Sequence, residues 1–219
     1  APIRRTAALL AGHGFVVAVR EISREFEPSA ELLAYYQAGQ ARRNALKITK
    51  ELAHYDADAR AGLAYLKSHP HCTGRLGTLG ICIGGHLAWR AAMNPDVLAG
   101  VCFYATDLHK HGLGKGTNDD SLRRTKEIKG ELLMIYGRQD PHVPAEGRAQ
   151  VYAALTEAGT NFTWHEFNGA HAFLRDEGHR YDPELALLGY GLAIGLFRRK
   201  LGEGDRASAD SEAAKETRH

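Results

Sequence analysis

The sequence predicts an α/β fold built on a mainly parallel sheet with helices on both faces. Short apolar runs alternate with segments whose apolar residues recur at helical spacing, an alternation typical of a parallel sheet. A length of 219 residues fits one α/β domain better than two. No apolar run reaches the ~18 residues that a membrane-spanning helix needs, so no membrane association is expected.

The first quarter of the chain is the least regular part of the prediction. Residues 2–13 are predicted to form a helix closed by Gly14, followed by a short buried strand, FVVAV, at 15–19. Residues 20–45 show no clean period, which indicates a long loop with some helix. From Thr49 to Lys67 apolar residues return at helical spacing, and SHPHCTG ends that helix.

The remaining elements alternate regularly until the end of the domain. We expect strands at 75–81, 98–105, 131–137 and 161–167, and helices at 84–94, 144–158 and 183–201. Residues 106–129 are polar and form either the rim or lid of a site or a plain surface loop. The predicted domain covers 1–201, and 202–219 is too polar to pack, which indicates a mobile tail.

Charge and cysteine content exclude several functional classes. Lys and Arg number 28 and Asp and Glu 26, a net charge of +2 that is too balanced for a nucleic-acid partner. The three cysteines include no C-x-x-C pair, which favours a reducing, cytoplasmic location. A metal site built from His69, His71 and Cys72 has little support, because these residues share one loop without a distant matching pair. We therefore expect neither a metal nor another cofactor.

The segment Gly80-Ile81-Cys82-Ile83-Gly84 lies between a predicted strand and a predicted helix, the context of a nucleophile elbow. Such a sharp turn exposes its central side chain and leaves no room for side chains two positions away, which explains the glycines. The helix that follows would favour thiolate at Cys82, and the Ile83 N–H would stabilise an oxyanion. The alternative is a buried cysteine in a glycine-rich turn.

Two further residues fit the acid and the base that such a cysteine needs. Asp140 and His171 each follow a later strand, in the order nucleophile, acid, base. Taken alone, Asp140 before Pro141 could be a turn or capping residue, and His171 is one of twelve histidines. Because order, spacing and strand-end position agree for all three, the sequence predicts a Cys82, His171, Asp140 triad.

The segments LGICIGGHLAWRAA, GRQDPHVPAEGR and GAHAFLRD resemble the dienelactone hydrolases of the α/β-hydrolase fold, and the resemblance extends to about residue 201. It implies a three-layer sandwich and a hydrolase that cleaves a small lactone or carboxylic ester through a thioester acyl-enzyme, without a cofactor. In this reading Cys82 attacks the carbonyl, Asp140 orients His171, and Ile83 is the first oxyanion donor. The substrate would be a small molecule, for which a carboxylate is one option.

The resemblance also implies residues that hold the substrate. Arg175 matches a family arginine that binds the substrate carboxylate. Arg42 or Arg43 would supply a second arginine for that carboxylate, and Arg43 is the preferred candidate. For both positions the alternative is a solvated arginine. Trp89 and Phe173 are both predicted to be packing residues, and of the two Phe173 is the better candidate for a wall of the pocket.

The chain departs from the family at its beginning, because it starts at the first helix of the fold. We expect an N-terminal segment with the missing strands, the second oxyanion donor and a family glutamate to precede Ala1. Glu21 and Glu25 follow the wrong strand and are not that glutamate. The departure leaves a second interpretation open, a non-catalytic binding or redox-sensing protein that uses Cys82. The sequence does not indicate an oligomeric state.

Overall fold

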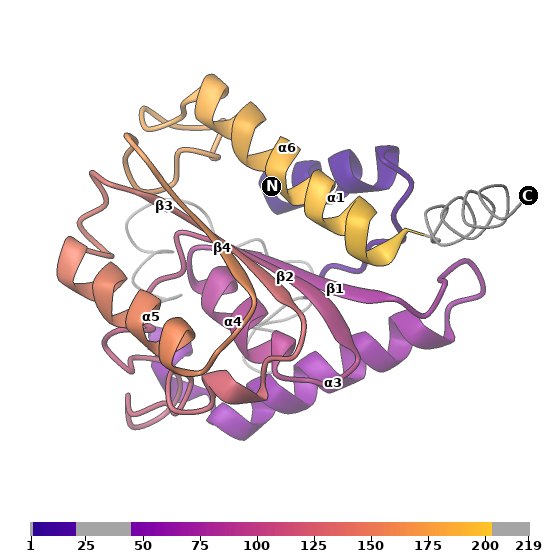
Figure 1. The fold of residues 1–219 in the computed structure, drawn as a ribbon, viewed down its shortest axis with the longest axis horizontal. Coiled ribbons are helices and arrows are strands. Elements are labelled where there is room, and N and C mark those ends of the chain that lie inside the picture. The colour runs from indigo at the N-terminus through magenta and orange to yellow at the C-terminus, as the bar shows by residue number, and fades with distance from the viewer. Residues whose placement is uncertain (1, 21–44, 203–219) are drawn as a thin grey trace, which may run out of the picture.

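A computed structural model describes residues 2–20 and 45–202 of the chain. Its centre is a four-stranded sheet in the order β1-β2-β3-β4, in which every neighbouring pair of strands is parallel. The strands are β1 (Leu76–Ile81), β2 (Val97–Phe103), β3 (Glu131–Gly137) and β4 (Phe162–Phe167). This arrangement confirms the predicted α/β class and its parallel sheet (Figure 1).

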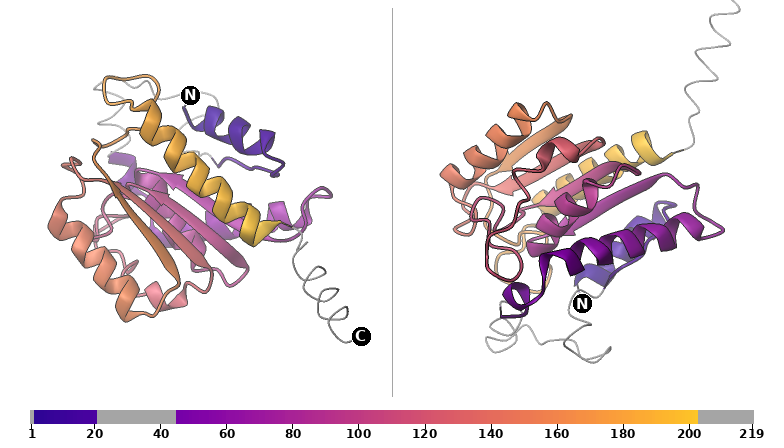
Figure 2. Two further views of the ribbon diagram at one scale, coloured as in Figure 1. Left: turned by 45° about the horizontal axis from the view of Figure 1, so that its top comes forward. Right: turned by 90° about the horizontal axis from the view of Figure 1, so that it is seen from below.

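Helices cover both faces of this sheet and give the molecule three layers. They are α1 (Pro2–Gly12), α3 (Leu52–Ser68), α4 (Ile83–Ala92), α5 (Ala145–Glu157) and α6 (Pro183–Leu201). Helices α1 and α6 lie side by side on one face, while α3, α4 and α5 lie on the other (Figures 1 and 2). Thr6 of α1 and Tyr190 of α6 share a hydrogen bond of 2.8 Å between their hydroxyls, which joins the two helices of the first layer.

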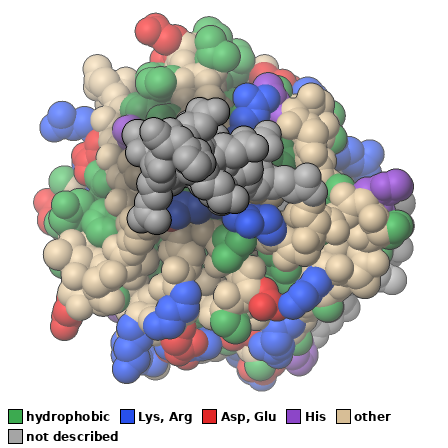
Figure 3. All heavy atoms as spheres, turned by 45° about the vertical axis from the view of Figure 1, so that its right-hand side comes forward, with side chains coloured by type: hydrophobic (Ala, Val, Ile, Leu, Met, Phe, Trp, Pro, Cys, Tyr) green, Lys and Arg blue, Asp and Glu red, His purple; other side chains and the backbone are tan. Residues whose placement is uncertain are grey.

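The core lies on the two middle strands. Every residue of β3 is buried, and β2 is buried at all but one position, because both strands are covered on both faces. Trp89 of α4 is fully buried, in agreement with its predicted packing role, and its indole N–H donates to the carbonyl of Ser121 at 3.3 Å. Charges of both signs are interspersed on the face shown in Figure 3, as the small net charge leads one to expect.

The helices and strands predicted after residue 48 are all present, with ends that differ by no more than three residues. The strand predicted at 15–19 is wrong. Those residues form no strand, and Val16 and Val19 are 37% and 50% exposed. An apolar run becomes a strand only when a neighbour accepts its backbone hydrogen bonds. Phe15 instead donates its N–H to Leu10 and packs against Phe197 of α6, with ring centroids 5.8 Å apart.

Two other predictions fall largely on residues that the structure does not describe. Of the predicted loop at 20–45, residues 21–44 lie outside them, and residues 45–49 are helical. The predicted tail lies outside them from residue 203 onward. Within the two described ranges, no helix combines the length and apolar character needed to cross a bilayer.

Candidate active site

The turn between β1 and α4 carries Cys82 in a strained backbone conformation. Cys82 has φ 61° and ψ −122°, a combination that L residues rarely adopt. A Cβ atom built on Gly80 would overlap the carbonyl oxygen of Gly84, so only glycine fits at position 80. A Cβ on Gly84 would meet no atom within 4 Å. The steric reason given from the sequence therefore holds for Gly80 and is wrong for Gly84.

Backbone hydrogen bonds fasten this turn to the end of β2. The Cys82 N–H donates to the carbonyl of Phe103 at 3.0 Å. The Cys82 carbonyl accepts from the N–H groups of Gly85 and Thr106, at 2.9 and 3.3 Å. These contacts hold the strained residue from both sides, so the position of its sulfur is defined by the sheet.

Three side chains from distant parts of the sequence meet at this turn. His171 Nε2 lies 3.3 Å from Cys82 Sγ, and His171 Nδ1 lies 2.6 Å from Asp140 Oδ2. Asp140 Oδ1 accepts the N–H of His142 at 2.8 Å, so both carboxylate oxygens are engaged. The residues follow β1, β3 and β4, and the carboxyl ends of parallel strands lie at the same edge of a sheet.

Burial and charge set the protonation of these groups. Asp140 and His171 are only 3% and 5% exposed. Burial lowers the pKa of His171, but the hydrogen bonds and charges of Asp140 and Cys82 outweigh it and raise that pKa to about 9. Burial raises the pKa of Asp140, but the hydrogen bond and charge of His171 and the contacts with His142 together outweigh it and leave that pKa below its usual value. A carboxylate can only accept, so Nδ1 carries a proton and Nε2 faces the sulfur.

A cavity of about 1680 Å³ opens above this group of residues. Cys82, Ile83 and His171 line it, and so do cationic side chains that include Arg175 and Arg180. Ile83 is the first residue of α4, so no earlier residue of that helix accepts its N–H. The cavity continues along β1 toward α1 and α3. Its volume exceeds the ~1,000 Å³ upper range for small-molecule sites.

Comparisons with known proteins identify the family of the chain. The family model described as "Dienelactone hydrolase family" matches residues 1–201. The chain belongs to the dienelactone hydrolase family. A Saccharomyces cerevisiae protein named "Putative carboxymethylenebutenolidase" is 37% identical over 207 residues, covering 91% of this chain and 76% of that protein. A Pseudomonas "Carboxymethylenebutenolidase" is 26% identical over 192 residues, covering 88% and 76%.

A solved structure shows that the fold is shared as well. The dienelactone hydrolase-like promiscuous phosphotriesterase from metagenomic libraries is similar with a TM-score of 0.71 and 19% identity. The similarity covers 92% of this chain and 81% of that one. At this identity the likeness concerns the fold alone. It confirms the three-layer α/β-hydrolase architecture expected from the sequence motifs.

The predicted substrate-binding residues of this chain differ in where the structure places them. Arg175 lines the cavity that holds Cys82 and His171. Phe173 is fully buried and does not line the cavity, so its prediction as a pocket wall is wrong. Its ring packs edge-on against Tyr104, with centroids 5.1 Å apart. Arg43, like Arg42, Glu21 and Glu25, lies outside the described residues.

Sequence reasoning missed two rings that enclose His171. Tyr104 and His142 contact it edge-on, with centroids 4.9 and 4.5 Å away. Both line the cavity, and Tyr104 directly follows β2 in a left-handed conformation with φ 34°. The strand-end rule that identified Asp140 and His171 would have identified Tyr104 too, had it been applied to β2.

The first residues of the polar segment 106–129 line the cavity, and later residues of the segment are buried in the core. Thr106, Asp107 and Lys110 line the cavity, whereas Leu113 and Ser121 are fully buried. It is thus neither a plain surface loop nor a lid free of the core. Among the residues that the structure describes, no group of three or more metal-binding side chains comes together.

Proposed function

We propose that this protein hydrolyses a small lactone or carboxylic ester of the carboxymethylenebutenolide type through Cys82, His171 and Asp140, with a thioester acyl-enzyme. One observation carries the proposal: His171 Nε2 lies 3.3 Å from the Cys82 sulfur while its Nδ1 lies 2.6 Å from Asp140. Family membership and the names of the two relatives support hydrolysis of this kind of substrate.

The first half of the reaction forms the thioester. His171, whose raised pKa favours the protonated ring, holds the proton of the Cys82 thiol, and the thiolate sulfur attacks the carbonyl carbon of the ester. The electron pair of the C=O bond moves onto oxygen, where the Ile83 N–H stabilises it. When this pair returns, the C–O bond to the alkoxide breaks and His171 gives the alkoxide its proton. For a lactone, the alkoxide stays attached to the acyl chain.

The second half releases the acid. His171 removes a proton from water, the hydroxide attacks the thioester, and the C–S bond breaks as Cys82 leaves. Asp140 keeps the Nδ1 proton in place and stabilises the positively charged imidazole in both halves. One ester and one water are consumed, and Cys82 and His171 return to their starting state.

The cavity supports a substrate that carries a carboxylate. Arg175 lines the same space as Cys82, and a guanidinium group binds a carboxylate through two parallel hydrogen bonds. We assign this role to Arg175, and Arg43 stays a second candidate. Changing Arg175 to alanine should raise KM for carboxylate-bearing substrates and leave neutral aryl esters less affected.

Ester hydrolysis by the full chain tests the proposal. 4-Nitrophenyl acetate and a dienelactone would each be assayed with the unchanged protein, Cys82→Ala and the matched control Cys72→Ser. We expect Cys82→Ala to lose roughly 10³-fold or more of kcat, and Cys72→Ser to retain it. Acid quenching during turnover should trap the acyl mass on the Cys82 peptide. Equal rates for the unchanged protein and Cys82→Ala would refute the proposal.

A further inference from the structure

Directly behind the nucleophile lies a buried histidine that the proposed mechanism does not use. His86 is on α4, four residues after Cys82, and its side chain is fully buried. Its Nδ1 lies 3.1 Å from the Thr106 carbonyl oxygen, and its Nε2 lies 2.7 Å from Ser121 Oγ. Burying an imidazole costs free energy, because the ring loses its hydrogen bonds to water, and these two contacts must offset that cost.

The Thr106 carbonyl fixes the direction of one hydrogen bond of His86. A carbonyl only accepts, so Nδ1 must carry the proton that binds Thr106. The Ser121 hydroxyl accepts from Arg90 Nη1 at 2.9 Å and lies beside His86 Nε2, which also faces Asp119. Nδ1 is therefore the donor on which the contact with Thr106 depends.

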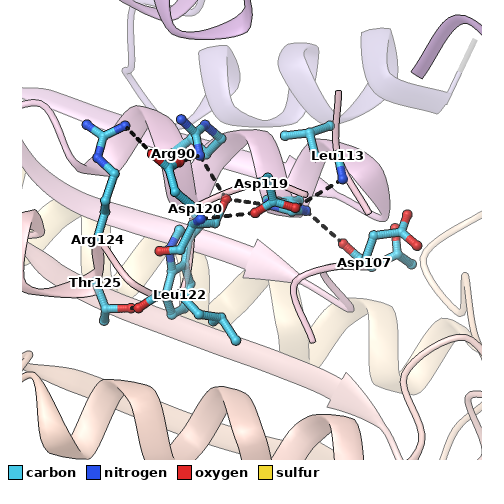
Figure 4. A network of polar contacts seen from close by, with 12 residues as sticks. Arg90, Asp107, Leu113, Asp119, Asp120, Leu122, Arg124 and Thr125 are labelled. Atoms are coloured by element: carbon cyan, nitrogen blue, oxygen red, sulfur yellow. Dashed lines mark hydrogen bonds and ion pairs between the residues drawn. The ribbon is translucent and has the colours of Figure 1, made fainter. Parts of the chain in front are cut away.

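Asp119 holds the far side of this arrangement. Its two oxygens accept the N–H groups of Ser121 and Leu113, each at 3.0 Å, and Oδ1 lies 3.4 Å from His86 Nε2 (Figure 4). Burial raises the pKa of Asp119, but the hydrogen bonds from His86, Ser121 and Leu113 outweigh it and lower that pKa. The carboxylate thus stays charged and keeps residues 113–121 folded against α4.

These contacts close a ring around the nucleophile. The Thr106 carbonyl accepts from His86, and the Thr106 N–H donates to the Cys82 carbonyl at 3.3 Å. The Thr106 hydroxyl lies 4.0 Å from Cys82 Sγ, at the outer limit of a hydrogen bond to sulfur. Cys82 is therefore linked to His86 in two ways: along the backbone of the first turn of α4, and through the hydrogen bonds of Thr106 to both residues.

We propose that His86 is a positioning residue for Cys82, because it holds Thr106 at the strained turn and keeps the Thr106 hydroxyl beside the sulfur. Asp119 and Ser121 hold His86 in turn. This inference rests on the proposed function for its effect on turnover. Its effect on the reactivity of the Cys82 thiol does not depend on that function.

Two amide variants separate the two nitrogens of the ring. His86→Asn places an amide N–H near the position of Nδ1 and so retains a donor for Thr106. His86→Gln places its amide near Nε2 and loses that donor. His86→Leu removes both contacts, and Thr106→Val and Thr106→Ser test the hydroxyl. All variants would carry Cys72→Ser, so that Cys82 is the accessible thiol that reacts with iodoacetamide.

Two rates would be measured at matched folded fraction: kcat with 4-nitrophenyl acetate, and alkylation of Cys82 by iodoacetamide. We expect His86→Gln, His86→Leu and Thr106→Val to lose roughly 10-fold to 100-fold of kcat, with KM changing less than about threefold. Alkylation should slow in the same three variants. His86→Asn and Thr106→Ser should recover most of both rates.

The amide pair also distinguishes positioning from simple support of the fold. Both amides leave a similar defect in the core, so a purely structural role would slow His86→Asn and His86→Gln equally. Equal rates in that pair, or full rates in Thr106→Val, would overturn the inference. If the unchanged protein does not hydrolyse the ester, the proposed function fails, and the alkylation rates still decide the positioning role.

Discussion

The proton on His171 Nδ1 is the detail of a single residue on which the site depends most. Asp140 fixes it there through a hydrogen bond of 2.6 Å, and this leaves Nε2 to exchange a proton with the sulfur 3.3 Å away. Tyr104 and His142 pack against the ring edges and limit its rotation. The imidazole is thus held by one charge and two aromatic contacts.

The raised pKa of His171 predicts how stability depends on pH. The folded protein holds this pKa at about 9, against an ordinary value of 6.5. A pKa raised by folding contributes stability that is complete below 6.5 and is lost as the pH rises through 9. Urea denaturation should therefore show the free energy of unfolding falling between these values, and falling less in Asp140→Asn. An identical fall in both proteins would contradict this account.

The turn between β1 and α4 shows how one element depends on a single small residue. At Gly80 a side chain would collide with the backbone of Gly84, and neither backbone can retreat, because one belongs to a strand and the other to a helix. At Gly84 the space is open. Two glycines of one motif thus carry different structural demands.

Exchange of each glycine for alanine measures that difference. Gly80→Ala should lower the free energy of unfolding by about 2 kcal/mol or more, because the added methyl overlaps backbone atoms. Gly84→Ala, in the first turn of α4, should change it by less than about 1 kcal/mol. Urea denaturation of both variants provides the measurement. A similar loss of stability in the two variants would contradict the claim that only Gly80 is required for steric reasons.

Elements with their own local signals were predictable from the sequence. The strands before Cys82, Asp140 and His171 have apolar runs followed by turns, and their parallel order brings the three residues to one edge. The run at 15–19 carries the same apolar signal, but strand formation requires a hydrogen-bonding neighbour that no local pattern reveals. For the same reason the burial of Phe173 away from the cavity and the contact between His86 and Thr106 were not predictable.

At the scale of the whole molecule, Arg90 joins the helical layer to the segment that follows β2. Its guanidinium donates to Asp56 of α3 at 2.7 and 2.8 Å and to Asp120 at 2.7 Å. The Arg90 side chain is 2% exposed, while those of Asp56 and Asp120 are 22% and 31% exposed. One buried cation therefore binds α3, α4 and residues 106–129 together.

Removing this cation should destabilise the molecule far more than removing an exposed one. Arg90→Met should lower the free energy of unfolding by about 3 kcal/mol, because it leaves two partly buried carboxylates with only the longer contacts of Arg124, at 3.6 and 3.7 Å. Lys67→Met is the matched control, since the Lys67–Asp96 pair is more than half exposed and should contribute less than about 1 kcal/mol. Thermal and urea denaturation would compare the two. Equal losses of stability in the two variants would show that Arg90 does not hold α3, α4 and residues 106–129 together.

The strands lie in space in the order in which they occur along the chain, from β1 to β4. During synthesis, Cys82 therefore leaves the ribosome well before His171, which follows 89 positions later. An unfinished chain carries the sulfur without the ring that takes its proton. Under the proposed mechanism, acylation of Cys82 therefore cannot begin before β4 has joined the sheet and placed His171 beside the sulfur.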